Sequence, residues 1–488
     1  MPDSLSRRLA SWAAALRYED LPPEVVDRAK GVTLHGLTSA LIGAGTPAGQ
    51  QALDLMQAED GAGAGVATAL VSGARLTKAS AGFVNAEIIL AGGKWDTFRM
   101  LTHPGAAILP AALAMGEVTG ASGRDYLTAV AAGYEVLERL AGEFIPTVMS
   151  RGFHAGPVFG IFGAAVAAAK LQGLNADQIH GAIAQCVNLA AGNLEGNRSG
   201  GGRVREGTAV RNALLAVGMA RQGGPAGETV LEGEAGFYHA YTGNNQGRLT
   251  YSFGGHTRTN LEDIAAGLGA DWRFLETLYR VYSTAGYNIA HIDVTAALCA
   301  EHDIQPEDVD RVEAVVNWLE TQYPSPAFPT RGGYGGPAAG GTEYFSAWGV
   351  VKRGFPILKT GPAPDDPPEV LDLMKRVTLI PAHNRSLFGP RVTIHLKDGT
   401  SFSKDGTGRE FIWDFEEEVR RIRGVAPGIP VSAAQFEQLM DTCRNLDSVD
   451  RAAQLIELSV PRGKGAHSRA RTGASARSSA GRRRPRPG

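Results

Sequence analysis

The sequence GIFGAAVAAAKLQG, residues 160–173, is built almost entirely from small and apolar residues. Two earlier stretches have the same character, AAILPAALAMGE at 106–117 and YLTAVAAGYEVLERLA at 126–141. Their apolar residues recur at spacings of three and four, which is the period of an α-helix. Their alanines and glycines would let neighbouring helices approach closely. This pattern runs from Leu5 to about Tyr241, and it predicts a tightly packed all-α domain.

The character of the sequence changes after about residue 272. The stretches DVDRVEAVVNWLE (308–320) and RVTIHLKDGTSFSKDG (391–406) have β-branched residues in alternation, and the KDG at 397–399 is a hairpin turn signal. Two helical patterns lie between them, EYFSAWGVVKRG and PPEVLDLMKRV. We therefore expect a mainly α protein with an inserted smaller α+β domain.

From Trp413 onward the sequence is helical again, and we expect these helices to pack back on the first domain. The final residues contain no aliphatic side chain larger than alanine, which is typical of a disordered segment. The predicted organisation is a helical domain at 1–272, an α+β domain at 273–410, C-terminal helices at 411–460 and a disordered basic tail at 461–488.

Charge and cysteine content limit the classes of function. The 488-residue chain has a formal net charge of -2, but nine of its 48 basic residues and no acidic residue fall within 462–488. The body is therefore acidic, which argues against nucleic acid or an anionic membrane as its partner. The three cysteines have neither metal-ligand nor redox spacing. The N-terminus has no continuous apolar segment typical of a signal peptide, so we expect a soluble, cytoplasmic protein.

The loop GGKWDTFRMLTHPGAAILP, residues 92–110, concentrates groups that can bind anions or transfer protons. It contains Lys94, Asp96, Thr97 and His103 immediately before a predicted helix. Because a helix N-terminus presents unpaired N–H groups, this arrangement suits an anion. The structural alternative is that Asp96 is a helix cap and that His103 is an ordinary hydrogen-bonded histidine.

Three further polar clusters have both a functional and a structural interpretation. His154 precedes a second Ala-rich helix, where capping or packing is the alternative role. Arg203 and Arg205 follow a triple glycine, and arginine forks bind carboxylate or phosphate, although a solvated basic loop would look the same. The α+β domain adds Tyr287, His291 and Tyr323 beside glycine-rich segments.

Taken together and in order, these clusters resemble the MmgE/PrpD family, which includes 2-methylcitrate dehydratase, cis-aconitate decarboxylase and iminodisuccinate epimerase. The resemblance covers about residues 5–455. It implies a helical domain formed by both ends of the chain, with the α+β domain as a lid. It further implies a homodimer that uses no organic cofactor or metal and binds a small di- or tricarboxylate between the helical domain and the lid. The matching stretches are LPPEVVDRAK, HPGAAILPAALAMGE, RGFHAGPVFGIFGAAVAAAKLQGL, VLEGEAGFYHAY and RVTIHLKDGTSFS.

The chain departs from the family pattern at several positions. Where the family has an Asp-rich DFDDT segment, only Asp96 and Thr97 match, and the earlier carboxylates are replaced by Gly93 and Trp95. His103 matches the histidine of the following HPG. The loss of the acidic residues indicates a substrate or an outcome different from that of the best-known relatives.

Other family positions are only partly kept. His154 matches the histidine of the family's GFH. In the family's Lys-x-x-His segment, Arg205 replaces the histidine and Arg203 supplies the positive charge of the missing lysine. In the lid, the family's Lys-x-Tyr-Pro segment becomes RVYSTAGYNIAH, where His291 aligns, and Tyr323 lies near a family tyrosine.

The resemblance suggests a cofactor-independent lyase, of the dehydratase or decarboxylase type, that moves a proton at a carbon next to a carboxylate. His103 would transfer the proton, with Asp96 orienting either His103 or the substrate. In a dehydration, His154 or Tyr323 would act as the second acid. The groups expected to bind substrate are Thr97, Lys94, Arg203, Arg205 and His291. An epimerase and a non-catalytic binding protein are the alternatives.

Overall fold

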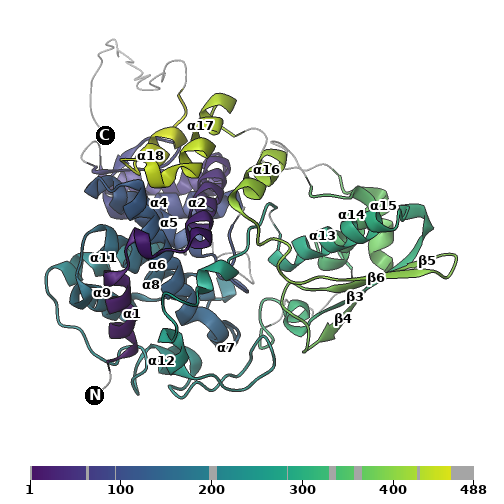
Figure 1. Cartoon of the computed structure of the whole chain (residues 1–488), viewed down its shortest axis with the longest axis horizontal. Coiled ribbons are helices and arrows are strands. Elements are labelled where there is room, and N and C mark those ends of the chain that lie inside the picture. Colours follow the sequence, from purple (N-terminus) through teal and green to yellow (C-terminus); the bar gives the residue numbers. More distant parts are fainter. Residues whose placement is uncertain are drawn as a thin grey trace, which may run out of the picture.

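The computed structural model describes residues 3–61, 65–93, 95–196, 206–282, 284–328, 337–356, 365–425 and 429–462. The chain is mainly helical, as predicted, and carries small β-sheets. Figure 1 shows a large helical body on one side and a smaller unit of strands and helices on the other.

The helical body is formed by most of the N-terminal half of the chain. Most of the Ala-rich stretch 160–173 lies in α8 (Ala155–Leu171). This helix is buried from Ala155 to Ala169 and contacts helices on several sides. The other elements of this half are α1 (Leu5–Ala15), α2 (Pro23–Gly43), α3 (Pro47–Asp60), β1 (Ala67–Thr68), β2 (Arg75–Leu76), α4 (Lys78–Gly92), α5 (Pro104–Thr119), α6 (Gly123–Ala141), α7 (Ile145–Ser150), α9 (Ala176–Leu189), α11 (Glu206–Arg221) and α12 (Phe237–Thr242).

Glycines set the distance between α6 and α8 at the centre of the body. A Cβ atom built on Gly163 would lie 2.7 Å from the carbonyl oxygen of Gly133, and one built on Gly133 would lie equally close to the carbonyl oxygen of Gly163. Real Cβ atoms are not found at such distances, so this crossing requires glycine on both helices. The small residues noted in the sequence therefore permit close contact between the two backbones.

The smaller unit is a four-stranded sheet covered by helices. Its strand order is β4-β3-β5-β6, with β3 parallel to β4 and antiparallel to β5, and with β5 antiparallel to β6. Alternate residues of β3 and β5 face a hydrophobic core of their own, against α13 and α14. The elements are α13 (Gly286–Glu301), β3 (Val309–Asn317), α14 (Thr342–Lys352), α15 (Pro368–Leu373), β4 (Val377–Ala382), β5 (Arg391–Leu396) and β6 (Ser401–Asp405).

Two features join this unit to the helical body. Helix α13 contributes Tyr287 and Ile289 to the large core and Ile292 and Leu298 to the small core. After the sheet, α16 (Phe415–Val425) and α17 (Ala433–Arg444) pack against α2, and α18 (Gln454–Ser459) packs against α17. Because α13 belongs to both cores, the exact domain boundaries stay a prediction.

Two general properties follow from the described residues. None of their helices is both long and apolar enough to cross a lipid bilayer. All three cysteines are buried and form no disulfide. The basic tail, apart from Arg462, lies outside the described residues.

Candidate active site

The polar loop between α4 and α5 is held by a segment from far along the chain. The backbone N–H of Thr97 donates to the carbonyl oxygen of Leu278 at 2.9 Å, and the N–H of Leu278 donates back to the carbonyl of Thr97 at 2.8 Å. Arg99 and Leu101 both have a φ of 52°, which is a left-handed conformation unusual for these residues. Such outliers cluster at functional sites, where the surrounding structure maintains them.

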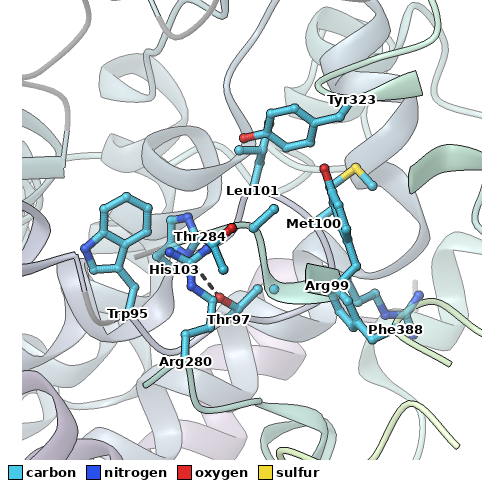
Figure 2. Close-up of a pocket in the computed structure, with 13 residues that line it drawn as sticks. Trp95, Thr97, Arg99, Met100, Leu101, His103, Arg280, Thr284, Tyr323 and Phe388 are labelled. Atoms are coloured by element: carbon cyan, nitrogen blue, oxygen red, sulfur yellow. Dashed lines mark hydrogen bonds between the residues drawn. The ribbon is translucent and has the colours of Figure 1, made fainter. Parts of the chain in front are cut away.

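The loop forms one wall of a cavity of about 190 Å³ (Figure 2). The other walls come from Arg280, from residues 284–287, from Tyr323 and from the loop that precedes β5. The cavity therefore lies where the helical body meets the smaller unit. Its lining residues are Trp95, Thr97, Arg99, Met100, Leu101, His103, Arg280, Thr284, Ala285, Gly286, Tyr287, Tyr323 and Phe388.

His103, which the sequence predicted as the proton-transferring residue, lines this cavity. It is buried at the start of α5, and its Nδ1 lies 3.1 Å from the carbonyl oxygen of Asp96 and 3.3 Å from the Thr97 hydroxyl. A carbonyl oxygen can only accept a hydrogen bond, so we assign the ring proton to Nδ1. In the neutral imidazole Nε2 then carries the lone pair, as a general base requires.

The carboxylate of Asp96 lies behind this histidine and is not among the groups that line the cavity. Both of its oxygens accept from the N–H of Gly105 at 3.0 Å, and Tyr134 donates its hydroxyl to one of them. Burial raises the pKa of Asp96, while these hydrogen bonds oppose that shift. Asp96 thus caps the first turn of α5 with its side chain and orients His103 with its backbone carbonyl.

Arg280 is a cavity residue that the sequence analysis missed. Its side chain is buried, its Nε has no hydrogen-bond partner, and no carboxylate of the described residues forms an ion pair with it. Burial lowers the pKa of Arg280 to about 10, so the guanidinium still carries its charge at neutral pH. The guanidinium carbon lies 4.5 Å from the centre of the Trp95 ring. Arg280 begins the segment RVYSTAGYNIAH, in which only His291 matched the family pattern, so no sequence signal identified this arginine.

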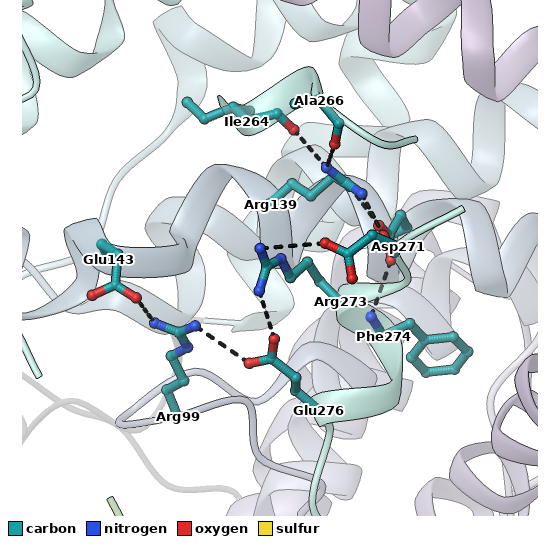
Figure 3. A network of polar contacts seen from close by, with 10 residues as sticks. Arg99, Arg139, Glu143, Ile264, Ala266, Asp271, Arg273, Phe274 and Glu276 are labelled. Carbon is teal, nitrogen blue, oxygen red and sulfur yellow. Dashed lines mark hydrogen bonds and ion pairs between the residues drawn. The ribbon is translucent and has the colours of Figure 1, made fainter. Parts of the chain in front are cut away.

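The other arginine of the cavity, Arg99, is already neutralised. It forms ion pairs with Glu143 and with Glu276, the latter at 3.3 Å, and Arg273 also binds Glu276 (Figure 3). In the same network Arg139 is bound by the backbone carbonyls of Ile264, Ala266 and Asp271. These contacts fix the segment that leads to Arg280 against the helical body.

The smaller unit contributes hydroxyl groups to the cavity. Tyr323, which the sequence predicted, lines the cavity with Tyr287, and the centres of their rings are 6.2 Å apart. Burial raises the pKa of Tyr287 well above its usual value, so this phenol keeps its proton at neutral pH. The hydroxyl-bearing side chains of Tyr287 and Tyr323 thus line the same cavity as His103.

The remaining predicted site residues are placed elsewhere or are not described. His154 is the N-cap of α8, where its Nδ1 accepts from the N–H of Gly156 at 3.1 Å. His291 is buried in α13, with Nδ1 2.7 Å from the Ser346 hydroxyl, and burial lowers its pKa to about 3. Neither histidine lines the cavity, because each side chain is packed among helices. Lys94, Arg203 and Arg205 lie outside the described residues.

Metal binding has no visible basis in the part of the chain that the structure describes. Within those residues, no group of three or more histidine, cysteine, aspartate or glutamate side chains is placed to hold a metal ion. The described lining of the cavity includes one imidazole, two guanidinium groups and several hydroxyls.

Comparison with known proteins adds independent information. Residues 7–250 match the model of the MmgE/PrpD N-terminal domain. A cis-aconitate decarboxylase of Aspergillus terreus is 25% identical over 93% of this chain and 95% of its own length. The human cis-aconitate decarboxylase is 26% identical over 79% of this chain and 80% of its own. A cis-aconitate decarboxylase-like protein of Aspergillus oryzae is 27% identical, over 58% of this chain and 59% of that protein.

Proposed function

The chain belongs to the MmgE/PrpD family, and we propose that it is a cofactor-independent lyase, of the dehydratase or decarboxylase type, acting on a small di- or tricarboxylic acid. The relatives support a lyase-type enzyme for a carboxylic acid without specifying the reaction. The observation that carries the proposal is that His103 and Arg280, a buried arginine that forms no ion pair within the described residues, line the same cavity.

Arg280 is the anchor for a substrate carboxylate. A guanidinium binds a carboxylate through two parallel N–H donors, and this interaction is stronger where water is excluded. The Thr97 and Thr284 hydroxyls line the same cavity and can donate to further oxygens. In this role Arg280 also stabilises the negative charge that spreads onto the carboxylate when the neighbouring carbon loses a proton.

His103 then moves the proton. In a dehydration, Nε2 takes the proton from the carbon beside the carboxylate, and the C–H electron pair becomes the double bond as hydroxide leaves with a proton from Tyr323. In a decarboxylation, the C–C bond breaks, carbon dioxide leaves, and the protonated imidazole delivers its proton to the carbon. Tyr323 replaces His154 as the preferred second acid because it lines the cavity and His154 does not.

Exchange of substrate protons with solvent tests this proposal. The protein is incubated in D₂O with citrate, cis-aconitate, 2-methylcitrate and tricarballylate, and proton NMR follows deuterium uptake and product formation. We expect deuterium at a carbon next to a carboxylate, together with loss of water or carbon dioxide. The H103Q variant should reduce this rate by about 10²–10⁴-fold, whereas H239Q on α12 outside the cavity should not.

Other results would contradict parts of the proposal. Deuterium uptake with inversion and without loss of a group would identify an epimerase. Binding of these acids with no exchange would indicate a non-catalytic binding protein. Full turnover by H103Q would remove His103 from the mechanism.

A further inference from the structure

Trp95 contacts both residues that carry the proposed reaction, Arg280 and His103. Its ring centre lies 4.5 Å from the guanidinium carbon of Arg280 and 4.6 Å from the centre of the His103 ring, which is tilted by 54°. All three residues line the cavity, and Figure 2 shows the indole beside the imidazole. One aromatic ring therefore connects the proposed carboxylate anchor to the proposed base.

The indole is itself held in place. Its Nε1–H donates to the carbonyl oxygen of Leu90 at 2.8 Å, in the last turn of α4. Gly93 ends that helix with a left-handed φ of 69°, which turns the chain toward Trp95. The ring is fixed at one edge by α4, so it can serve as a rigid support for the side chains that contact it.

An aromatic ring supports an arginine in a way that a carboxylate does not. The face of an indole attracts a guanidinium through its quadrupole and leaves the in-plane N–H donors available. A carboxylate at the same place would bind those donors and cancel the charge. Arg280 is buried and forms no ion pair within the described residues, so its donors remain available to a ligand.

We propose that Trp95 is a positioning residue that determines specificity, by holding Arg280 charged and oriented at a fixed place relative to His103. This inference rests on the proposed function. A substrate carboxylate bound to Arg280 then presents its adjacent carbon to the imidazole. The site selects acids in which the transferred proton lies on the carbon next to the anchored carboxylate.

Three variants of Trp95 separate this role from simple filling of space. W95F keeps an aromatic face, W95L keeps the volume apolar without one, and W95D introduces a carboxylate beside Arg280. W12F, in the distant Trp12–Trp272 pair of the helical body, is the matched control for loss of an indole. R280M reports the complete loss of the anchor.

Affinity for tricarballylate and succinate is measured by isothermal titration calorimetry at two salt concentrations. We expect W12F to match the wild type, W95F to lie within about threefold of it, W95L to lose about tenfold, and W95D to lose nearly as much as R280M. The turnover assay should show a lower kcat and a higher KM for W95L, both largely restored in W95F. If W95D binds tricarballylate and succinate as tightly as the wild type while R280M binds them weakly, the inference is overturned.

A second measurement does not depend on any substrate. In protein with ¹⁵N-labelled arginine, the Arg280 Nε–H resonance is identified by its loss in R280K. The Trp95 ring should shift this resonance, and W95L should return it toward the ordinary range. An unchanged resonance in W95L would overturn the inference even if the lyase activity is found. If the wild type neither binds nor exchanges the acids, the proposed function fails, and this shift alone decides whether Trp95 holds Arg280.

Discussion

Arg280 forms no ion pair with a carboxylate of the described residues, although the charge of Asp96 favours its protonated form. A buried charge without an ionic partner destabilises a folded protein by roughly several kcal/mol. The Trp95 ring offsets part of this cost, since a desolvated cation–π contact contributes about 2 kcal/mol. Under the proposed function, a bound carboxylate offsets the remainder. The cavity is then preorganised for that carboxylate, because the unfavourable step of desolvating the arginine is completed during folding.

Glu320 is a second buried ionisable group near the cavity, and it holds part of its wall. Its Oε1 accepts from the backbone N–H of Phe388 at 2.9 Å, while its Oε2 is buried without a partner. Phe388 lines the cavity with a left-handed φ of 63°. Burial raises the pKa of Glu320 to about 8, so the carboxyl group is protonated at neutral pH.

This raised pKa predicts how stability depends on pH. Between about pH 4.5 and pH 8 the unfolded chain loses the Glu320 proton and the native protein keeps it. The stabilising contribution of the protonated Glu320 carboxyl is thus fully present at low pH. As pH rises through this range, the free energy of unfolding falls by at most about 1.4 kcal/mol per pH unit. E320Q should remove that slope, as measured by urea unfolding from pH 5 to pH 9. E24Q, an exposed carboxylate on α2, should keep the wild-type slope.

The crossing of α6 and α8 shows what the small residues contribute at the scale of elements. We expect G163A to lower the free energy of unfolding by about 1–3 kcal/mol, because the added methyl group meets the Gly133 carbonyl and must push the helices apart. G218A on α11 is the control, since an added Cβ there contacts nothing within 4 Å. Alanine should be neutral or stabilising at that position. Equal denaturation midpoints for the two variants would contradict this account of the crossing.

The elements that the sequence predicted are those whose burial repeats along the chain. The period of three and four marked α5, α6 and α8, and the alternation of β-branched residues marked β3 and β5. Strand β4 was missed, and part of the reason is visible in its burial. This strand contains Pro381, pairs only with β3, and exposes or half-exposes all of its residues except Val377. Without a buried face it has no alternation to detect.

From the residues alone, the site was most predictable where its side chains lie close together in sequence. The density of polar groups in one loop led to Thr97 and His103, and the family resemblance led to Tyr323. Arg280 reaches the same cavity because Thr97 pairs with Leu278, a contact across the chain that no spacing rule reveals. His154 and His291 had equally good sequence arguments, yet each packs inside a helical core. Spacing predicts helix faces, whereas the cavity depends on which faces meet.

At the scale of the whole molecule, the cavity depends on two parts of the chain that share one helix. The loop that carries His103, the proposed base, comes from the helical body, and Tyr287 and Tyr323 come from the smaller unit. Helix α13 packs into both cores, with Tyr287 near its start at the cavity. Movement of the smaller unit would therefore move this tyrosine relative to His103. The homodimer that the family resemblance implies stays a prediction, which light scattering after gel filtration can test.

The basic tail has a definable starting point on the folded body. Gln435 of α17 donates to the carbonyl oxygens of Leu458 and Val460 and accepts from the backbone N–H of Arg462. These bonds anchor the chain through Arg462. Removal of residues 463–488, which carry eight basic and no acidic residues, should therefore leave all of them intact.

We expect truncation after Arg462 to leave the melting temperature and the deuterium-exchange rate unchanged. Truncation after Ser459 removes two of the three anchoring hydrogen bonds. Because each bond contributes about 1 kcal/mol, this shorter protein should melt at a lower temperature. If the tail recruits an acidic partner, the full chain should bind heparin in a salt-dependent way and the shorter form should not. A loss of exchange after removal of residues 463–488 alone would instead place the tail at the active site.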